Sequence, residues 1–213
     1  FEQWPPDPTS FSPPATSVIG QPDFVSFQPN QGNAQPSSAT LSFPVGAAFN
    51  GTDLFVADSG NHRVLDFPFS GGTFTTATHV LGQTGFEYNA PNLVEGREFN
   101  FFNSTLQLNG GGVAVDNASS PPHLYVADPG NNRVLAFNDF RTVVAGQKAD
   151  LVIGQPDFLH SLVNYPTNSP DTPSSSSLFA PTAVTVDSNG DLWVADAGNG
   201  RVLRFPIPFQ QTG

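Results

Sequence analysis

Cysteine and methionine are both absent from the sequence. Without cysteine the chain can form no disulfide bond, and it lacks the thiol nucleophile of a cysteine-dependent enzyme. Charged residues are also scarce, since they make up 12% of the chain, which is about half of the usual share. We therefore expect a surface made mainly of uncharged polar side chains.

Basic residues are the scarcer of the two charged classes. The chain has 7 Lys and Arg against 18 Asp and Glu, which gives a formal net charge of −11. Nucleic acids and anionic membrane surfaces both attract clustered Lys and Arg, so we expect no nucleic-acid partner. No apolar run is long enough to span a bilayer, and so no membrane insertion is expected.

The first residue is Phe, which is typical of a processed chain. We therefore expect a secreted protein, located outside the cell or at the cell surface, although a trimmed chain would look the same. Residues 1–16 are rich in Pro, Ser and Thr and are interpreted as a linker or an extended arm.

One stretch occurs three times: LFVADSGNHRVLDF at 54–67, LYVADPGNNRVLAF at 124–137 and LWVADAGNGRVLRF at 192–205. The interval between copies is about 70 residues. Each copy contains two runs rich in Val, Leu and aromatic residues, joined by Asp-x-Gly-Asn. This pattern predicts a β-hairpin in every repeat.

The polar residues shared by the three turns are predicted to be structural. We expect each Gly to supply a positive φ and each Asn to tolerate left-handed geometry. Each Asp can accept N–H groups of the turn or pair with the following Arg. Anion or metal binding is the alternative, but occurrence in every copy favours the structural role. These residues are Asp58, Gly60, Asn61 and Arg63, then Asp128, Gly130, Asn131 and Arg133, and finally Asp196, Gly198, Asn199 and Arg201.

The motif Asn-x-Arg-Val-Leu-x-Phe after Leu-aromatic-Val-Ala-Asp resembles the NHL repeat. In that family each repeat forms one four-stranded blade of a β-propeller, so the resemblance implies an all-β fold with three such blades. NHL repeats are usually about 40 to 45 residues long, and the wider spacing here implies insertions. The family includes ligand-binding and RNA-binding modules, sensor domains and a metal-dependent amidating lyase, so the resemblance leaves function open.

A second element also occurs three times: SVIGQPDF at 17–24, HVLGQTGF at 79–86 and LVIGQPDF at 151–158. We interpret it as a short strand ending in a turn, and as the outer strand of a blade. The chain then divides into an arm with a surplus strand, two complete blades and a third blade without its outer strand. The corresponding ranges are 1–22, 23–83, 84–155 and 156–213.

The surplus strand near the start of the sequence and the missing outer strand of the third blade together predict self-assembly. Three blades are too few to close a propeller, and an unpaired strand edge is a template for another strand. A head-to-tail contact of this kind generates a fibre or a ring, and two chains would make six blades. A fragment of a longer NHL propeller is a further alternative. The pairing segments are Ser17, Val18, Ile19, Gly20 and Gln21 of one molecule and Arg201, Val202, Leu203, Arg204 and Phe205 of the next.

The sequence contains few residue patterns that indicate catalysis, and we predict no catalytic residue, metal or cofactor. No Gly-x-Ser-x-Gly elbow occurs, and the histidines, His62, His79, His123 and His160, are interpreted as scattered surface residues. The stretch 187–191, Asp-Ser-Asn-Gly-Asp, resembles the start of a calcium loop but is predicted to be a hairpin turn. The alternative is a six-bladed dimer that binds a small ligand or acts as a metal-dependent lyase or hydrolase.

Three sequons and the phenylalanines complete the sequence-based expectations. Asn50, Asn103 and Asn117 are candidate N-glycosylation sites in loops or at strand ends, so attached glycans are a further expectation. Phe67, Phe137 and Phe205 are predicted core residues. Phe24, Phe86 and Phe158 are predicted to pack between blades. The sequence therefore favours a non-catalytic structural or interaction protein that assembles with itself.

Overall fold

The computed structural model describes residues 14–211 except residues 75 and 92. The proline-rich arm before residue 14 lies outside this description. The fold is all-β, with 34% of residues in strands, as the repeats predict. In the described part of the chain, no helix has the length and hydropathy needed to cross a membrane.

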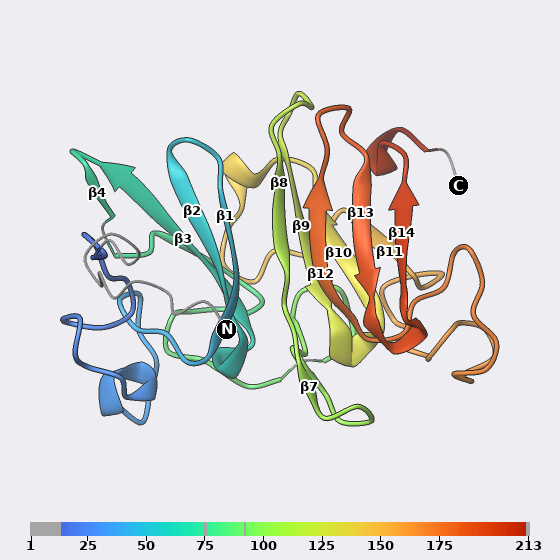
Figure 1. Cartoon of the computed structure of the whole chain (residues 1–213), viewed down its shortest axis with the longest axis horizontal. Helices are drawn as coiled ribbons and strands as arrows, with labels where there is room; N and C mark the ends of the chain where they lie inside the picture. The colour runs from blue at the N-terminus through green and yellow to red at the C-terminus, as the bar shows by residue number, and fades with distance from the viewer. Residues whose placement is uncertain (1–13, 75, 92, 212–213) are drawn as a thin grey trace, which may run out of the picture.

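Three antiparallel sheets follow one another along the long axis of the molecule (Figure 1). The first contains β1 (Pro44–Phe49), β2 (Asp53–Asp58), β3 (Arg63–Ser70), β4 (Thr73–Phe74) and β5 (His79–Leu81). The second contains β8 (Val113–Asp116), β9 (His123–Asp128), β10 (Arg133–Phe137) and β11 (Leu151–Ile153). The third contains β12 (Pro181–Val186), β13 (Leu192–Asp196) and β14 (Arg201–Phe205).

Short elements join these sheets. A two-stranded hairpin that the sequence did not predict, β6 (Phe102–Asn103) with β7 (Leu108–Asn109), lies in the second insertion. The 3-10 helices are η1 (Pro29–Gly32), η2 (Ser59–Asn61), η3 (Pro129–Asn131), η4 (Phe140–Thr142), η5 (Ala197–Asn199) and η6 (Pro208–Gln210). Three of them, η2, η3 and η5, form the turns of the repeated hairpins.

The three repeated hairpins have the same register. Asp58 pairs with Arg63, Asp128 with Arg133, and Asp196 with Arg201, one on each side of the turn. On the far side of the hairpin, β5 pairs with β3 and β11 pairs with β10, so both complete sheets carry the predicted outer strand. No strand lies on the corresponding side of β14 among the described residues.

The hydrophobic core lies between the sheets. Phe55 and Leu81 of the first sheet pack with Leu124 and Phe137 of the second. Side chains on the other face of the second sheet, including Tyr125, pack in the same way with the third sheet. Each sheet therefore contacts the next through one face, which is the arrangement of successive propeller blades.

A third cluster covers the free face of the first sheet. Leu65 and Phe67 are buried there, and Ile19 and Phe86 pack against them. The predicted core role of Phe67 and Phe137 is confirmed, and half-buried Phe205 packs against the second core cluster.

The inter-blade phenylalanines divide into two cases. Phe86 packs against the third cluster, and Phe158 packs against the first. Phe24, at the corresponding position of the first copy, is exposed. The segment that contains Phe24 therefore lacks the blade neighbours that its two equivalents have.

The predicted role of the turn glycines is wrong. The positive φ falls one residue after each Asn, at His62, Asn132 and Gly200, and the turn asparagines are not among the positive-φ residues. The glycines instead permit close packing, because a Cβ on Gly130 would lie 2.4 Å from Cγ of Asn100. Gly60 and Gly198 are crowded in the same way by Ser42 and Phe179.

The prediction of a strand at 17–21 is also wrong for the isolated chain. These residues have no strand partner and follow an irregular path. The physical reason is that an isolated segment gains no ladder of hydrogen bonds until a neighbouring edge is present.

We predict that Gly130→Ala destabilises the protein by about 1 to 3 kcal/mol, because the added methyl group must displace Asn100. Gly200→Asn is the matched control: it introduces the residue that the second copy has at this positive φ, where a Cβ meets nothing within 4 Å. The control should change stability by no more than about 0.5 kcal/mol. Urea unfolding measures both, and equal losses would contradict the packing role of Gly130.

Candidate assembly site

An ion pair between Asp and Arg fixes the turn of each repeated hairpin, and it is fully buried in the first two repeats. In the second repeat, Oδ2 of Asp128 accepts hydrogen bonds from Nε of Arg133 at 2.8 Å and from Nδ2 of Asn131 at 2.8 Å. Its Oδ1 accepts the N–H of Asn100, which lies in the insertion before the blade, at 2.7 Å. The turn is thereby tied to the insertion.

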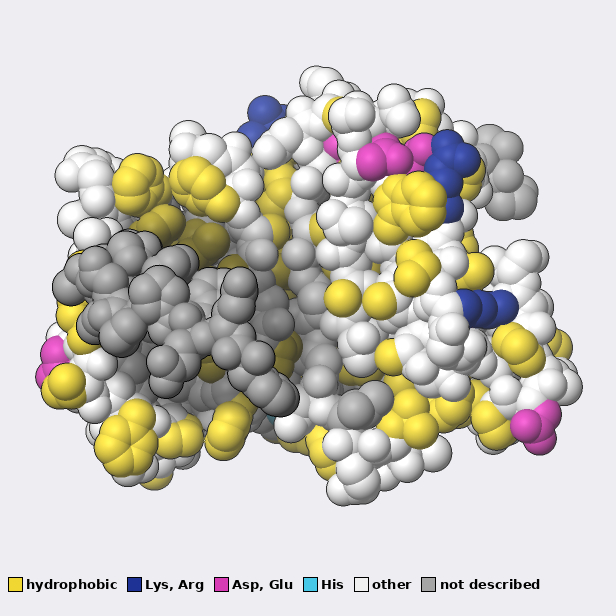
Figure 2. Space-filling view, in the orientation of Figure 1, with side chains coloured by type: hydrophobic (Ala, Val, Ile, Leu, Met, Phe, Trp, Pro, Cys, Tyr) yellow, Lys and Arg dark blue, Asp and Glu magenta, His cyan; other side chains and the backbone are white. Residues whose placement is uncertain are grey.

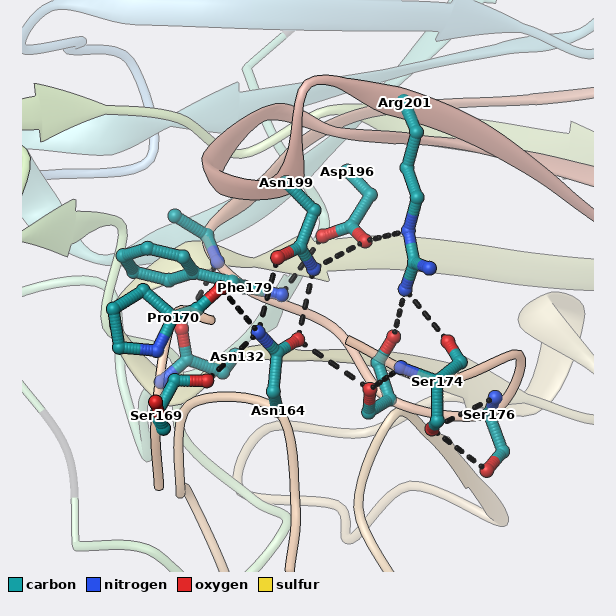
Figure 3. Close-up of polar contacts among 12 residues, drawn as sticks. Asn132, Asn164, Ser169, Pro170, Ser174, Ser176, Phe179, Asp196, Asn199 and Arg201 are labelled. Atoms are coloured by element: carbon teal, nitrogen blue, oxygen red, sulfur yellow. Dashed lines mark hydrogen bonds and ion pairs between the residues drawn. The ribbon is translucent and has the colours of Figure 1, made fainter. Parts of the chain in front are cut away.

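The same contacts occur in the first and third repeats. Asp58 accepts from Arg63, Asn61 and the N–H of Ser42. Asp196 accepts from Arg201, Asn199 and the N–H of Phe179 (Figure 3). The predicted pairing of Asp with Arg is confirmed in all three copies.

The guanidinium groups of the first two repeats are fully buried and reach the outer-strand segment. Nη1 of Arg63 donates to the carbonyl of Phe86, and Nη1 of Arg133 donates to the carbonyl of Phe158 at 2.9 Å. Burial raises the pKa of Asp128, while Arg133 and the amide donors favour its ionised form. Each arginine therefore joins turn, insertion and outer-strand segment.

Arg201 lacks one of these contacts. Its Nη2 donates to the carbonyl of Ser174 (Figure 3) and to that of Ser177. Its Nη1 has no hydrogen-bond partner among residues 14–211 as described, and its side chain is 26% exposed. The carbonyl that a Phe after Gly-Gln supplies in the other repeats is missing here.

In the structure as described, the segment around Gln21 lacks a contact to a hairpin turn that its two equivalents make. In every copy the glutamine donates through Nε2 to the carbonyl seven residues later, at Gln28, Ala90 and Leu162. Gln83 and Gln155 also donate to the positive-φ residue of their own hairpin turn, at 3.2 Å and 2.9 Å. Within the described part of the chain, Gln21 makes no such bond.

The position of this segment matches that of its two equivalents. Gly20, Gly82 and Gly154 all have a positive φ and lie against the side chain of Leu41, Phe99 or Leu178 in the following insertion. Residues 17–24 therefore sit beside the first blade as β5 sits beside the second blade and β11 beside the third. In Figure 1 this segment and β14 lie at opposite sides of the molecule.

The outer edge of β14 presents unpaired backbone groups. In β3 the carbonyl of Asp66 points outwards and accepts the N–H of Thr78, and in β10 the carbonyl of Ala136 accepts from Asp150. Arg204 is the equivalent residue of β14. Because backbone groups alternate along a strand, Val202 also presents its N–H and C=O to this edge. Its side chain is 63% exposed.

Comparison with known proteins identifies the repeat. The family model for the NHL repeat matches residues 180–205, which contain the third blade with its Asp196–Arg201 pair. The chain therefore contains an NHL repeat at these residues. A search of the curated proteins finds no match.

Solved structures resemble this NHL-repeat protein at low sequence identity. An auxiliary nutrient binding protein of Bacteroides thetaiotaomicron is 13% identical, with a TM-score of 0.48, over 74% of this chain and 36% of its own. A periplasmic gluconolactonase of Pseudomonas aeruginosa is 17% identical, with a TM-score of 0.39, over 78% of this chain and 42% of its own. The chain thus spans less than half of the length of either protein.

The histidines of the NHL-repeat protein are not all surface residues. His123 is buried and its Nδ1 is hydrogen-bonded to the carbonyl of Asn138. Nδ1 of His62 accepts the N–H of Phe101 at 3.1 Å, and burial lowers the pKa of this imidazole. His79 and His160 each contact an Asp. No group of three potential metal-ligating side chains was found in the described ranges.

The stretch 187–191 forms the predicted turn between β12 and β13. Oδ1 of Asp187 accepts the N–H groups of Asn189 and Asp191. The carboxylate of Asp191 instead contacts Arg204 of β14. These two carboxylates therefore serve the turn and the neighbouring strand.

The three sequons lie in different settings. Asn117 is exposed, and Asn50 uses its side chain within its own turn. Asn103 is 4% exposed and its Nδ2 donates to the carbonyl of Pro129 at 3.0 Å. A glycan on this nitrogen would have no room in the folded protein.

Sequence reasoning missed two residues of the repeated site. Asn30 and Asn164 exchange side-chain hydrogen bonds with Asn61 and Asn199, respectively. The signal was present, because each lies six residues after the Phe of its Gly-Gln element.

We predict that Arg133→Ala costs about 3 to 5 kcal/mol, because it leaves the buried carboxylate of Asp128 without its partner. Arg201→Ala is the matched variant and should cost less, because its guanidinium is partly solvated and has fewer partners. Urea unfolding at low protein concentration compares the two. Equal losses would contradict the difference in burial and bonding between the second and third copies.

Proposed function

We propose that this NHL-repeat protein assembles with itself, head to tail, into a fibre or a ring. Residues 17–21 of one copy add to the outer edge of β14 in another copy and complete its third blade. The observation that carries this proposal is that two parts of the molecule lack complementary contacts. Among the described residues, Arg201 lacks the Phe carbonyl that the other two arginines bind, and the Gly-Gln-Pro-Asp-Phe segment at 20–24 lacks the hairpin that its two equivalents contact.

The internal repeats define the register of the added strand. In the first blade Val64 pairs with Leu81 and Leu65 with Val80, and the second blade repeats this pattern. Transferred to the third blade, Val202 pairs with Ile19, Leu203 with Val18 and Arg204 with Ser17. Strand addition of this kind satisfies backbone groups that water otherwise solvates.

Two side-chain contacts follow from the same register. The carbonyl of Phe24 reaches Nη1 of Arg201, as Phe86 and Phe158 reach Arg63 and Arg133. Nε2 of Gln21 reaches the carbonyl of Gly200, which occupies the position of His62 and Asn132. The added segment is thus recognised through an arginine and a turn as well as through its backbone.

A structural role outside the cell fits these features best. The Asp and Arg side chains that recur in the three repeats are occupied in holding the hairpin turns. A cavity of about 300 Å³ between β1, β8 and β12 is lined by Ala47, Val113, Val184 and similar side chains, without converging charged groups. We therefore propose a non-catalytic assembly protein whose partner is another copy of itself.

Val202→Pro tests the proposal, because it removes an N–H that the added strand needs but that faces no strand among the described residues. Proline is tolerated at such edge positions, so the fold should persist. We expect Val202→Pro to abolish assembly in negative-stain electron microscopy and in light scattering. Val202→Thr, which keeps the N–H and suits a strand, should assemble like the parent.

A variant without residues 1–22 tests the donor side and should also remain monomeric. Fibres and closed rings both support the proposal, and their images distinguish them. A parent protein that stays monomeric at high concentration would contradict it, as would assembly that survives both changes.

A further inference from the structure

An aromatic contact recurs at each internal blade junction. Phe55 of β2 packs against Phe140, which follows the third strand of the second blade, with ring centroids 5.2 Å apart. Tyr125 of β9 packs against Phe209, which follows the third strand of the third blade, at 6.0 Å. The register places Trp193 of β13 at the same position as Phe55 and Tyr125.

In the described part of the chain, no further blade packs against Trp193. Its side chain is 37% exposed, whereas Phe55 and Tyr125 are fully buried. Its indole N–H donates to Asp187 at 3.0 Å, which holds the ring on the outer face of the third sheet. Hydrophobic side chains are exposed over β12 to β14 in the space-filling view (Figure 2).

The first blade also has an aromatic residue after its third strand, and it packs against the cluster on the free face of the first sheet. Phe74 in β4 follows the third strand of that blade and packs beside Phe69, with centroids 4.8 Å apart. A groove of about 320 Å³ opens beside it, and it is lined by Phe67, Phe74, Ala39 and residues 18–22. The groove therefore adjoins the segment that the proposed assembly uses.

We infer that Trp193 of one copy packs against Phe74 in this groove of the next copy. The inference rests on the proposed head-to-tail assembly and identifies the second surface that it uses. The occupant is another copy of this chain, because the contact continues the two internal blade junctions. The junction between copies then has the same two parts as an internal junction: an outer strand and an aromatic pair.

Fluorescence and assembly measurements test this inference together. In a Trp4→Phe background Trp193 is the only tryptophan. Its emission should move to shorter wavelength as the protein assembles, because the ring leaves water. Trp193→Ala should raise the concentration needed for assembly by about tenfold or more, as expected for a buried aromatic anchor.

Three further variants test whether the effect on assembly is specific to the contact between Trp193 and Phe74. Trp193→Phe should assemble like the parent, because phenylalanine occupies the equivalent position in the first blade. Phe74→Ala should weaken assembly as Trp193→Ala does. Tyr88→Ala removes an exposed aromatic ring in an insertion and should have no effect. Urea unfolding of each variant at low concentration confirms that the single chain is folded.

The outcomes separate this inference from the proposal on which it rests. Unchanged emission on assembly, or normal assembly of Trp193→Ala, would overturn the Trp193 contact while Val202→Pro still blocks strand addition. Assembly that Val202→Pro leaves intact would overturn strand addition itself. A blue shift combined with loss of assembly in both Trp193→Ala and Phe74→Ala is the expected result.

Discussion

The pair of Asp and Arg at each hairpin turn is the interaction on which the rest of the fold depends. Removing two charges from water is costly, and in the second repeat the cost is offset because both oxygens of Asp128 and all three guanidinium nitrogens of Arg133 are hydrogen-bonded. One Asp oxygen holds the insertion, and the other holds Asn and Arg. The arginine then reaches the outer-strand segment. Three distant parts of a repeat are thereby fixed by one polar cluster.

This dependence explains why the third repeat differs from the other two. Its Asp196 and Arg201 make the turn and insertion contacts, but the contact to an outer-strand segment is absent in the described chain. The residues that supply this contact elsewhere follow a Gly-Gln element, and the copy at residues 17–24 lies on the far side of the molecule (Figure 1). The cluster of Asp and Arg that stabilises a complete blade is thus, in the third blade, free to bind an outer-strand segment from another molecule.

Among the described residues, the exposed face of the third blade also lacks the neighbour that the first two blades have. A sheet face that is buried in two repeats and exposed in the third presents Val202 and Trp193 to solvent. Exposed groups of large apolar side chains are typical of interaction surfaces. Backbone edge, arginine and aromatic ring lie on one side of the molecule, so one neighbouring blade can satisfy all of them.

The sequence alone determined the all-β fold, the three hairpins and the pairing of Asp with Arg, because these depend on local patterns that repeat. It did not determine the role of Gly130, since crowding by Asn100 is a contact between distant segments. The burial of His62 and His123, and the bonds of Asn30 and Asn164, likewise depend on how insertions fold back. Only the tertiary structure placed residues 17–24 beside the first blade without a strand partner, because strand pairing needs an edge that the local sequence does not provide.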